Sequence, residues 1–198
     1  MVERLRFNKA RQVLEAFPRL FEDVGLDPAD ATSVEFARKL AAAGRGSDAV
    51  QYVACLLARR EAVWWGCQCV RALGESDADA ALLAAEAWVR EPEDATRRAA
   101  LKIGAAGNLR VATTWLALAA GHSGGSVAPE EAPPVPASSD ASAIDVKAAI
   151  IVACVAKPLA DYAAWTGACV EAGLRFAEGG EAKVLAPKSD AASRRAAS

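Results

Sequence analysis

The sequence predicts an all-α fold, a single-domain bundle of antiparallel helical hairpins. Much of its 53% hydrophobic content is alanine, and alanine, leucine, glutamate and arginine are strong helix formers. The β-branched and aromatic residues that favour strands are few and scattered. A chain of 198 residues buries a sufficient core without metals or disulfides. We expect one domain over residues 1–179, with a long Pro-rich loop at 121–141 and a disordered polar tail at 180–198.

The N-terminal part is expected to form two helices. Apolar residues at loose helical spacing within residues 1–25 predict a short amphipathic helix, interrupted at Pro18 because proline has no N–H to donate. Thr32 and Glu35 match the S/T-x-x-E capping box. The helix that they open is expected to end near Gly44.

The middle of the chain begins with a predicted helical hairpin. Ser47 or Asp48 is the expected N-cap of a helix that stops near Ala58. Residues 59–73 are expected to form the central helix, closed by Gly74. The short connection predicts that these two helices pack antiparallel to each other.

A second hairpin is expected to follow, with helices at 77–90 and 93–106 and with Pro92 at the first helical position of the latter. A further helix is expected at 109–120. Consecutive hairpins of about thirty residues are typical of HEAT and armadillo repeats, which stack to bury their apolar faces. Only small and apolar positions match between the two hairpins, so a helical bundle is the main prediction and a solenoid-like arrangement is the alternative.

Two helices are expected in the C-terminal part of the domain. Ser142 and Asp145 resemble a capping pair at the start of a helix over 143–156. Pro158 is expected to open the last helix, which continues to about Ala177.

Net charge and hydropathy exclude two classes of partner. The formal net charge is -2, from 23 basic and 25 acidic residues, so no overall field attracts nucleic acid. The N-terminus carries charges where a secretory peptide has its apolar run, and the longest apolar stretch, 148–156, is too short to span a bilayer. We expect no nucleic-acid partner and no membrane segment.

The five cysteines are expected to be reduced and buried. Their number is odd, and all of them lie inside alanine-rich apolar segments. Cys67 and Cys69 project about 200° apart on a helix, so the two thiolates cannot reach one metal ion. The chain holds a single histidine. The sequence thus predicts a cytoplasmic protein with no metal site and no cofactor.

The segment RREAVWWGCQCVR at residues 59–71 divides into two faces when projected on a helix. Arg60, Trp64 and Arg71 fall on one face. Gln68 falls on this face too, whereas Ala62, Val63, Trp65, Cys67, Cys69, Val70 and Ala72 are expected to face the core. An exposed tryptophan between arginines predicts an aromatic and basic surface for a protein partner. The alternative is that Trp64 packs against a neighbouring helix.

The long loop (GHSGGSVAPEEAPPVPASSDA) is the second candidate contact surface. Residues 127–146 contain no basic residue, and their prolines favour extended polyproline geometry. The acids of this segment are Glu130, Glu131, Asp140 and Asp145. Such a segment can lie along a groove or bind a partner, and the alternative is a solvated linker.

Three blocks of the sequence resemble an uncharacterised bacterial family, a domain of unknown function of about this length. The blocks are RREAVWW at 59–65, AEAWV at 85–89 and a WLALAAxxSGGSxAP pattern that ends at Pro129. The resemblance covers roughly residues 35–175. Members of the family often accompany type VI secretion and forkhead-associated-domain genes. The resemblance implies a bacterial cytosolic accessory protein and supplies no activity.

The start of the loop offers weak candidates for chemistry. His122 and Ser123 are imaginable as base and nucleophile of a hydrolase, but adjacency in sequence is not a hydrogen-bonded pair. The family that the chain resembles carries two bulky aromatic residues in place of Gly121 and His122, which argues against a shared catalytic histidine. The Gly124, Gly125, Ser126 run can in principle wrap a phosphate, but it follows a helix C-terminus, so a turn is the preferred interpretation.

We therefore expect a non-enzymatic protein-protein interaction module, an adaptor, chaperone or scaffold. Its expected contact residues are Arg60, Trp64, Arg71, His122, Ser123, Gly124, Gly125 and Ser126. The alternative function is a hydrolase or small-ligand-binding protein that uses His122 and Ser123. A homo-oligomer is the remaining alternative for the partner.

Overall fold

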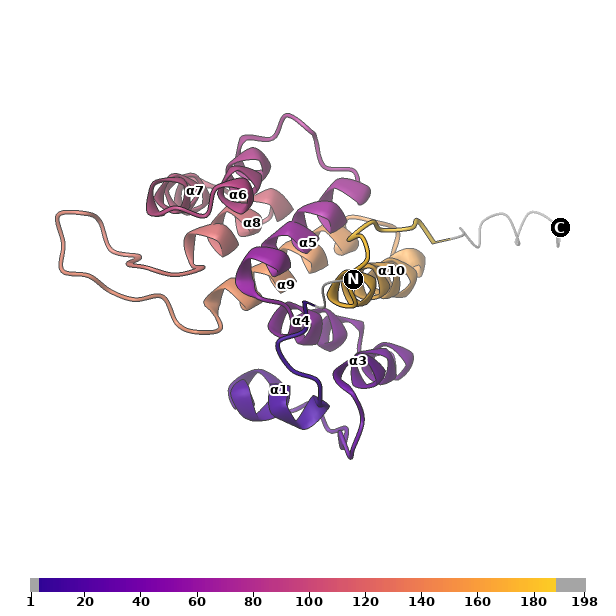
Figure 1. Cartoon of the computed structure of the whole chain (residues 1–198). Helices are drawn as coiled ribbons and strands as arrows, with labels where there is room; N and C mark the ends of the chain where they lie inside the picture. Colours follow the sequence, from indigo (N-terminus) through magenta and orange to yellow (C-terminus); the bar gives the residue numbers. More distant parts are fainter. Residues whose placement is uncertain (1–3, 188–198) are drawn as a thin grey trace, which may run out of the picture.

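The computed structural model describes residues 4–187 and consists of α-helices joined by loops (Figure 1). In chain order the elements are α1 (Ala10–Ala16), α2 (Pro18–Phe21), α3 (Ser33–Ala42), α4 (Gly46–Leu56), α5 (Arg59–Ala72), α6 (Ala80–Arg90), α7 (Asp94–Ala106), α8 (Ala112–Gly121), α9 (Ala141–Val155), the 3-10 helix η1 (Leu159–Asp161) and α10 (Tyr162–Ala177). The described residues form no β-sheet, only three isolated bridges. The all-α prediction is confirmed.

Helix α5 lies at the centre of the bundle and packs against α6, α8, α9 and α10. The side chain of Trp65 is fully buried, and its Nε1 donates a 2.9 Å hydrogen bond to the carbonyl oxygen of Cys169 on α10. Cys67 and Cys69 are also fully buried. An indole ring buries more apolar surface than any other side chain and needs a partner for its N–H when buried. The predicted core face of this helix is confirmed.

The packing order is that of a bundle and not of a solenoid. Helix α4 packs mainly against α3, α9 and α10 and has only a minor contact with α5, so these two helices do not form the closely packed hairpin that was predicted. Helices α6, α7, α8 and α9 do pack against their neighbours in sequence. In a solenoid each repeat contacts only the adjacent repeats. Here α10 returns to cover α3, α4 and α5, and the core is shared by elements far apart in the chain.

Two helix starts show which local patterns survive folding. The capping box of α3 forms as predicted, because Thr32 Oγ1 accepts a 3.2 Å hydrogen bond from Glu35 N and Glu35 Oε2 accepts one of 2.8 Å from Thr32 N. Helix α4 starts at Gly46, so neither Ser47 nor Asp48 is its N-cap. The Asp48 carboxylate instead pairs with Arg45 Nε at 2.6 Å.

The predicted capping pair at the start of α9 is wrong. The helix begins at Ala141, and no side chain caps it. Ser142 Oγ donates a 2.8 Å hydrogen bond to the carbonyl oxygen of Ala119 on α8 instead. Asp145 faces His122 at the end of α8. Both polar side chains join α9 to α8, which the capping interpretation did not foresee.

The loop between α8 and α9 projects past α7 and α8 (Figure 1). Its base is closed by a 2.8 Å hydrogen bond from Val127 N to the carbonyl oxygen of Val135. Ser126 Oγ accepts hydrogen bonds from Ala128 N at 3.1 Å and from Val135 N at 3.0 Å. The loop is thus a restrained arm.

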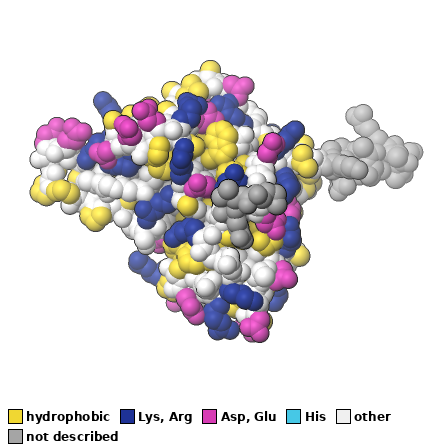
Figure 2. Space-filling view, in the orientation of Figure 1, with side chains coloured by type: hydrophobic (Ala, Val, Ile, Leu, Met, Phe, Trp, Pro, Cys, Tyr) yellow, Lys and Arg dark blue, Asp and Glu magenta, His cyan; other side chains and the backbone are white. Residues whose placement is uncertain are grey.

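The segment after α10 runs back along the bundle. Residues 180–187 of the predicted disordered tail are described, and Ala182 among them is buried with 4% of its surface exposed. Residues 188–198 lie outside the described part of the chain. Among the described helices, none is long and apolar enough to cross a membrane. On the face shown in Figure 2, apolar side chains lie between basic and acidic ones.

Candidate functional site

A groove crosses the outer face of α5 between the C-terminus of α6 and the end of α10. Two adjoining hollows, of ≈ 300 Å³ and ≈ 540 Å³, form it, and both are lined by Arg4, Trp64 and Phe176. Arg60, Glu61, Val89 and Arg90 complete the first hollow, and Gln68, Gly180, Glu181, Ala182 and Lys183 complete the second. We call this surface the Trp64 groove.

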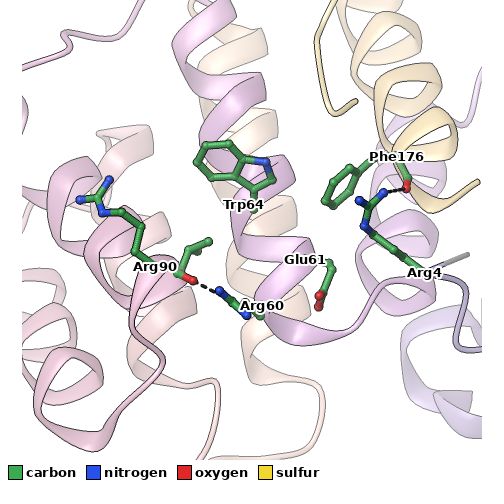
Figure 3. A pocket seen from close by; sticks show the side chains of 7 residues that line it. Arg4, Arg60, Glu61, Trp64, Arg90 and Phe176 are labelled. Carbon is green, nitrogen blue, oxygen red and sulfur yellow. Dashed lines mark hydrogen bonds between the residues drawn. The ribbon is translucent and has the colours of Figure 1, made fainter. Parts of the chain in front are cut away.

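Trp64 forms the middle of the groove. Its side chain is half-buried, in contrast to the fully buried Trp65 beside it. In Figure 3 the indole stands out from α5, with Phe176 and Arg4 on one side and Arg90 on the other. An aromatic ring that is only partly covered offers both an apolar face and an N–H donor to a partner.

The arginines of the groove are held by backbone carbonyls. Arg60 Nε donates a 2.7 Å hydrogen bond to the carbonyl oxygen of Val89. Arg4 Nη1 donates one of 2.9 Å to the carbonyl oxygen of Phe176, and its guanidinium carbon lies 4.3 Å from the centroid of the Phe176 ring. A carbonyl orients a guanidinium without neutralising its charge, so both groups remain able to attract an anionic partner.

The groove carries more positive than negative side chains. Its basic side chains are those of Arg4, Arg60, Arg90 and Lys183, and its acidic side chains are those of Glu61 and Glu181. Arg90 has one weak carboxylate neighbour, Glu86, at 4.0 Å. The chain as a whole has a net charge of -2, so this local excess of cations is a property of the groove. It favours an acidic ligand.

Arg71 does not line this groove, contrary to its predicted role. Its Nε and Nη2 donate to the two carboxylate oxygens of Glu86 at 2.8 Å and 3.0 Å, and Nη1 pairs with Asp77. The Arg71 guanidinium thus links α5 to α6. Trp64 takes part in none of the cation–π contacts of the described residues, which involve phenylalanines and Trp165.

The start of the loop wraps an arginine. Arg97 of α7 is 4% exposed, and its Nη1 and Nη2 donate to the carbonyl oxygens of Gly121 at 2.8 Å and Ser126 at 2.9 Å. Gly125 has a φ of 61°, and a Cβ there would lie 3.0 Å from Arg97 Nε. Only glycine tolerates that backbone conformation at such close range. The glycine run is therefore a turn around a guanidinium, and not a phosphate cradle.

The loop residues predicted to bind a partner are mainly engaged inside the protein. The carbonyl oxygen of Ser123 accepts a 2.7 Å hydrogen bond from Arg59 Nη1, and Ser123 is buried. Gly124 lies at the surface of the same turn, with open space where a Cβ would be. Residues 121–136 line neither hollow of the groove. The structure thus keeps Arg60 and Trp64 together and places Arg71 and the loop apart from them.

His122 forms a pair with a buried carboxylate. Its Nδ1 lies 2.7 Å from Asp145 Oδ2, and the two side chains are 26% and 8% exposed. Burial raises the pKa of the Asp145 carboxyl, and the hydrogen bond with His122 opposes that rise. A carboxylate and the imidazole that it orients are two of the three groups of a catalytic triad, the third being the nucleophile. No hydrogen bond joins the ring to the hydroxyl of Ser123 or of another described residue.

The cysteines have the environment predicted for them. All five are free and buried, and burial raises the pKa of Cys55 to about 12. Within the described residues, no group of three or more His, Cys, Asp or Glu side chains is placed to hold a metal ion.

Sequence reasoning missed several residues that build the site. Arg4 and Phe176 lie at opposite ends of the chain, and no local spacing indicates that they meet. Arg97 resembles any other arginine of an exposed helix face until the loop folds over it. Asp145 has the spacing of a local cap with Ser142, and the long loop that separates it from His122 in the sequence gives no signal for the pair.

The fold and the groove define an all-α protein with a partly exposed aromatic and basic surface. The chain belongs to a family of unknown function (DUF6931), whose model matches residues 36–177. The resemblance to an uncharacterised family is thus confirmed. No curated protein matches the chain significantly, and no solved structure does. The match includes Trp64 and Phe176, whereas Arg4 lies outside it.

Proposed function

We propose that the protein is a non-enzymatic interaction module, an adaptor, chaperone or scaffold, which binds a partner protein through the Trp64 groove. One observation carries the proposal: a tryptophan of the central core helix is left half-exposed between cationic side chains. Tryptophan and arginine are the residue types that most often dominate binding free energy at interfaces. The hollow beside them gives a partner side chain a place to pack.

We further propose a bacterial, cytoplasmic setting and an association with type VI secretion. The support is the resemblance carried by the RREAVWW, AEAWV and SGGSxAP blocks. Components of that secretion system are therefore the first partners to test. The five free, buried thiols suit a reducing compartment.

The test combines affinity capture with crosslinking at the groove. A photo-reactive phenylalanine analogue at Gln68, which lines the groove, is compared with the same analogue at Leu159, which is 89% exposed on another surface. We expect a specific crosslinked partner from Gln68 only, and its loss in Trp64→Ala. Equal crosslinking from both positions, or a partner that Trp64→Ala retains, contradicts the proposal.

A hydrolase is the second candidate, and the contact of His122 with Asp145 is the observation that favours it. A catalytic serine must form or reach a hydrogen bond with the other ring nitrogen, Nε2. A fluorophosphonate probe that labels active serines tests this directly, with Ser123→Ala as the matched control. Labelling of the native chain that disappears in Ser123→Ala supports the hydrolase; equal labelling of the two removes its basis.

A further inference from the structure

The exposed tip of the projecting loop, residues 128–136, is acidic and rich in proline. The Glu130 side chain is 75% exposed, and Val135 is 51% exposed. Glu131, Pro133, Pro134 and Pro136 are exposed as well. The hydrogen bonds that Ser126 Oγ accepts hold the two sides of the loop together. A loop already held in shape loses little conformational entropy when it binds.

The loop tip matches the chemistry of the Trp64 groove. Aromatic side chains that line a groove bind proline rings in extended polyproline segments. Trp64 and Phe176 supply the aromatic surface, and Arg60 and Arg90 lie where acidic side chains would be attracted. The tip contains the two acids Glu130 and Glu131 and no basic residue. It is the part of the described chain with both the charge and the prolines that the groove favours.

The loop is anchored away from the groove of its own chain. Arg97 holds its base, and Arg98 Nη1 donates a 3.2 Å hydrogen bond to the carbonyl oxygen of Ala128. Arg98 Nε also lies 3.7 Å from the carboxylate of Glu130. In Figure 1 the loop extends from the side of α7 and α8, away from α10 and the C-terminal segment. A loop held in this way is available to a groove on another molecule.

We propose that the Trp64 groove receives the acidic, proline-rich loop tip of a second copy of this chain. This rests on the proposed function, because it names the occupant of the same groove. Each molecule offers one loop and one groove, so the contact joins two different surfaces. Such a contact forms either a reciprocal pair or a chain that grows head to tail.

The experiment is a complementation between two variants of the full chain. The loop variant carries Glu131→Lys and Val135→Ser. The groove variant carries Trp64→Ala and Arg90→Glu. The charge control is Arg110→Glu, at an exposed arginine outside the groove. The loop variant keeps an intact groove, and the groove variant keeps an intact loop. Circular dichroism and thermal melting confirm that each variant is folded before its mass is measured by light scattering.

We expect the native chain and Arg110→Glu to self-associate with a dissociation constant in about the micromolar range, as small interfaces do. Either variant alone is expected to weaken the association about tenfold or more, since it loses an anchor and a charge pair. Mixed in equal amounts, the two variants are expected to form heterodimers. Added salt is expected to weaken all of these contacts because it screens charge.

A labelled peptide with the sequence of residues 127–137 is the second probe. It is expected to bind the native chain and not the groove variant. A native chain that stays monomeric and does not bind the peptide overturns the loop proposal. If Trp64→Ala still abolishes capture of the crosslinked partner, the proposed function survives that result; if Trp64→Ala changes nothing, both proposals fail.

Discussion

His122 Nδ1 lies 2.7 Å from Asp145 Oδ2, and this contact joins the C-cap residue of α8 to the first turns of α9. The carboxylate side chain is 8% exposed, so it depends on a partner inside the protein. The two residues flank the loop, one at each end of it. The pair therefore fixes the points at which the chain leaves the bundle and returns to it.

The first prediction concerns the titration of Asp145. Burial raises the pKa of this carboxyl, and His122 opposes the rise. In His122→Ala we expect the Asp145 pKa to rise further, because the opposing hydrogen bond is lost while the burial remains. Side-chain carboxyl NMR against pH measures the shift. An unchanged or lowered Asp145 pKa contradicts the expectation.

The same shift fixes the sign of a stability change. A carboxyl whose pKa is raised on folding binds its proton more tightly in the folded state. The free energy of unfolding therefore falls as the pH rises from the unfolded pKa to the folded one. Urea unfolding should show that this fall is absent in Asp145→Asn. Asp94 is an internal control for the NMR titration, since hydrogen bonds from Arg97 and Arg98 lower its pKa and His122 takes no part.

The second prediction compares two glycines of α10. A Cβ on Gly173 would lie 2.5 Å from Val53 Cγ1 and 2.8 Å from Trp65 Cε2, closer than real Cβ contacts. Gly173→Ala is expected to cost about 1–3 kcal/mol, because the rigid core must move. Gly167 has open space around its Cβ position, and Gly167→Ala is expected to gain about 0.5–1 kcal/mol from helix propensity. Urea unfolding measures the free energy of unfolding of both variants. A Gly173→Ala variant that is more stable than the native chain would show that α10 does not lie this close to α4 and α5.

The third prediction concerns the anchor of the loop. Arg97→Lys keeps the charge but loses the planar fork that binds the carbonyl oxygens of Gly121 and Ser126 together. We expect a loss of about 1–3 kcal/mol in the free energy of unfolding, since buried acceptors are left without donors. Hydrogen exchange at residues 121–128 should become faster.

The matched control for this variant is Arg98→Lys, one residue further along α7. The Arg98 side chain is 25% exposed and the Arg97 side chain 5%. We therefore expect a smaller loss of stability for Arg98→Lys, with slow exchange retained near Gly121. Equal effects of the two substitutions would mean that charge, and not the fork geometry, holds the loop.

Local patterns in the sequence predicted the features that depend on residues a few positions apart. Thr32 and Glu35 are three residues apart, and their capping box formed with both hydrogen bonds. The two faces of α5 followed from the helical period alone, and they separated Trp65, which is fully buried, from Trp64, which is half-buried. The helical period is fixed within one or two turns, so distant contacts leave it unchanged.

Contacts between residues far apart in the chain decided the other features of the fold and of the site, and sequence patterns do not encode such contacts. Ser142 and Asp145 had the spacing of a local cap, but both face α8, because buried polar groups take whichever partner the packing offers. The groove depends on Arg4 reaching Phe176 from the opposite end of the chain. The contribution of Trp64 and Arg60 to the candidate site was therefore predictable, and the walls supplied by the distant segments of the chain were not.

The last prediction tests the division between the two adjacent tryptophans. Trp65→Ala removes a fully buried ring and the hydrogen bond to Cys169, so it is expected to cost about 3–5 kcal/mol. Trp64→Ala removes a half-buried ring at the edge of an open groove, and a cost of about 1 kcal/mol is expected. Urea unfolding measures both, and acrylamide quenching of fluorescence in Trp65→Phe and Trp64→Phe reports which ring is accessible. Because the two residues share one helix and one side-chain chemistry, the difference in cost measures burial together with the hydrogen bond to Cys169. Equal costs would make Trp64 a core residue and would leave the groove without its binding surface.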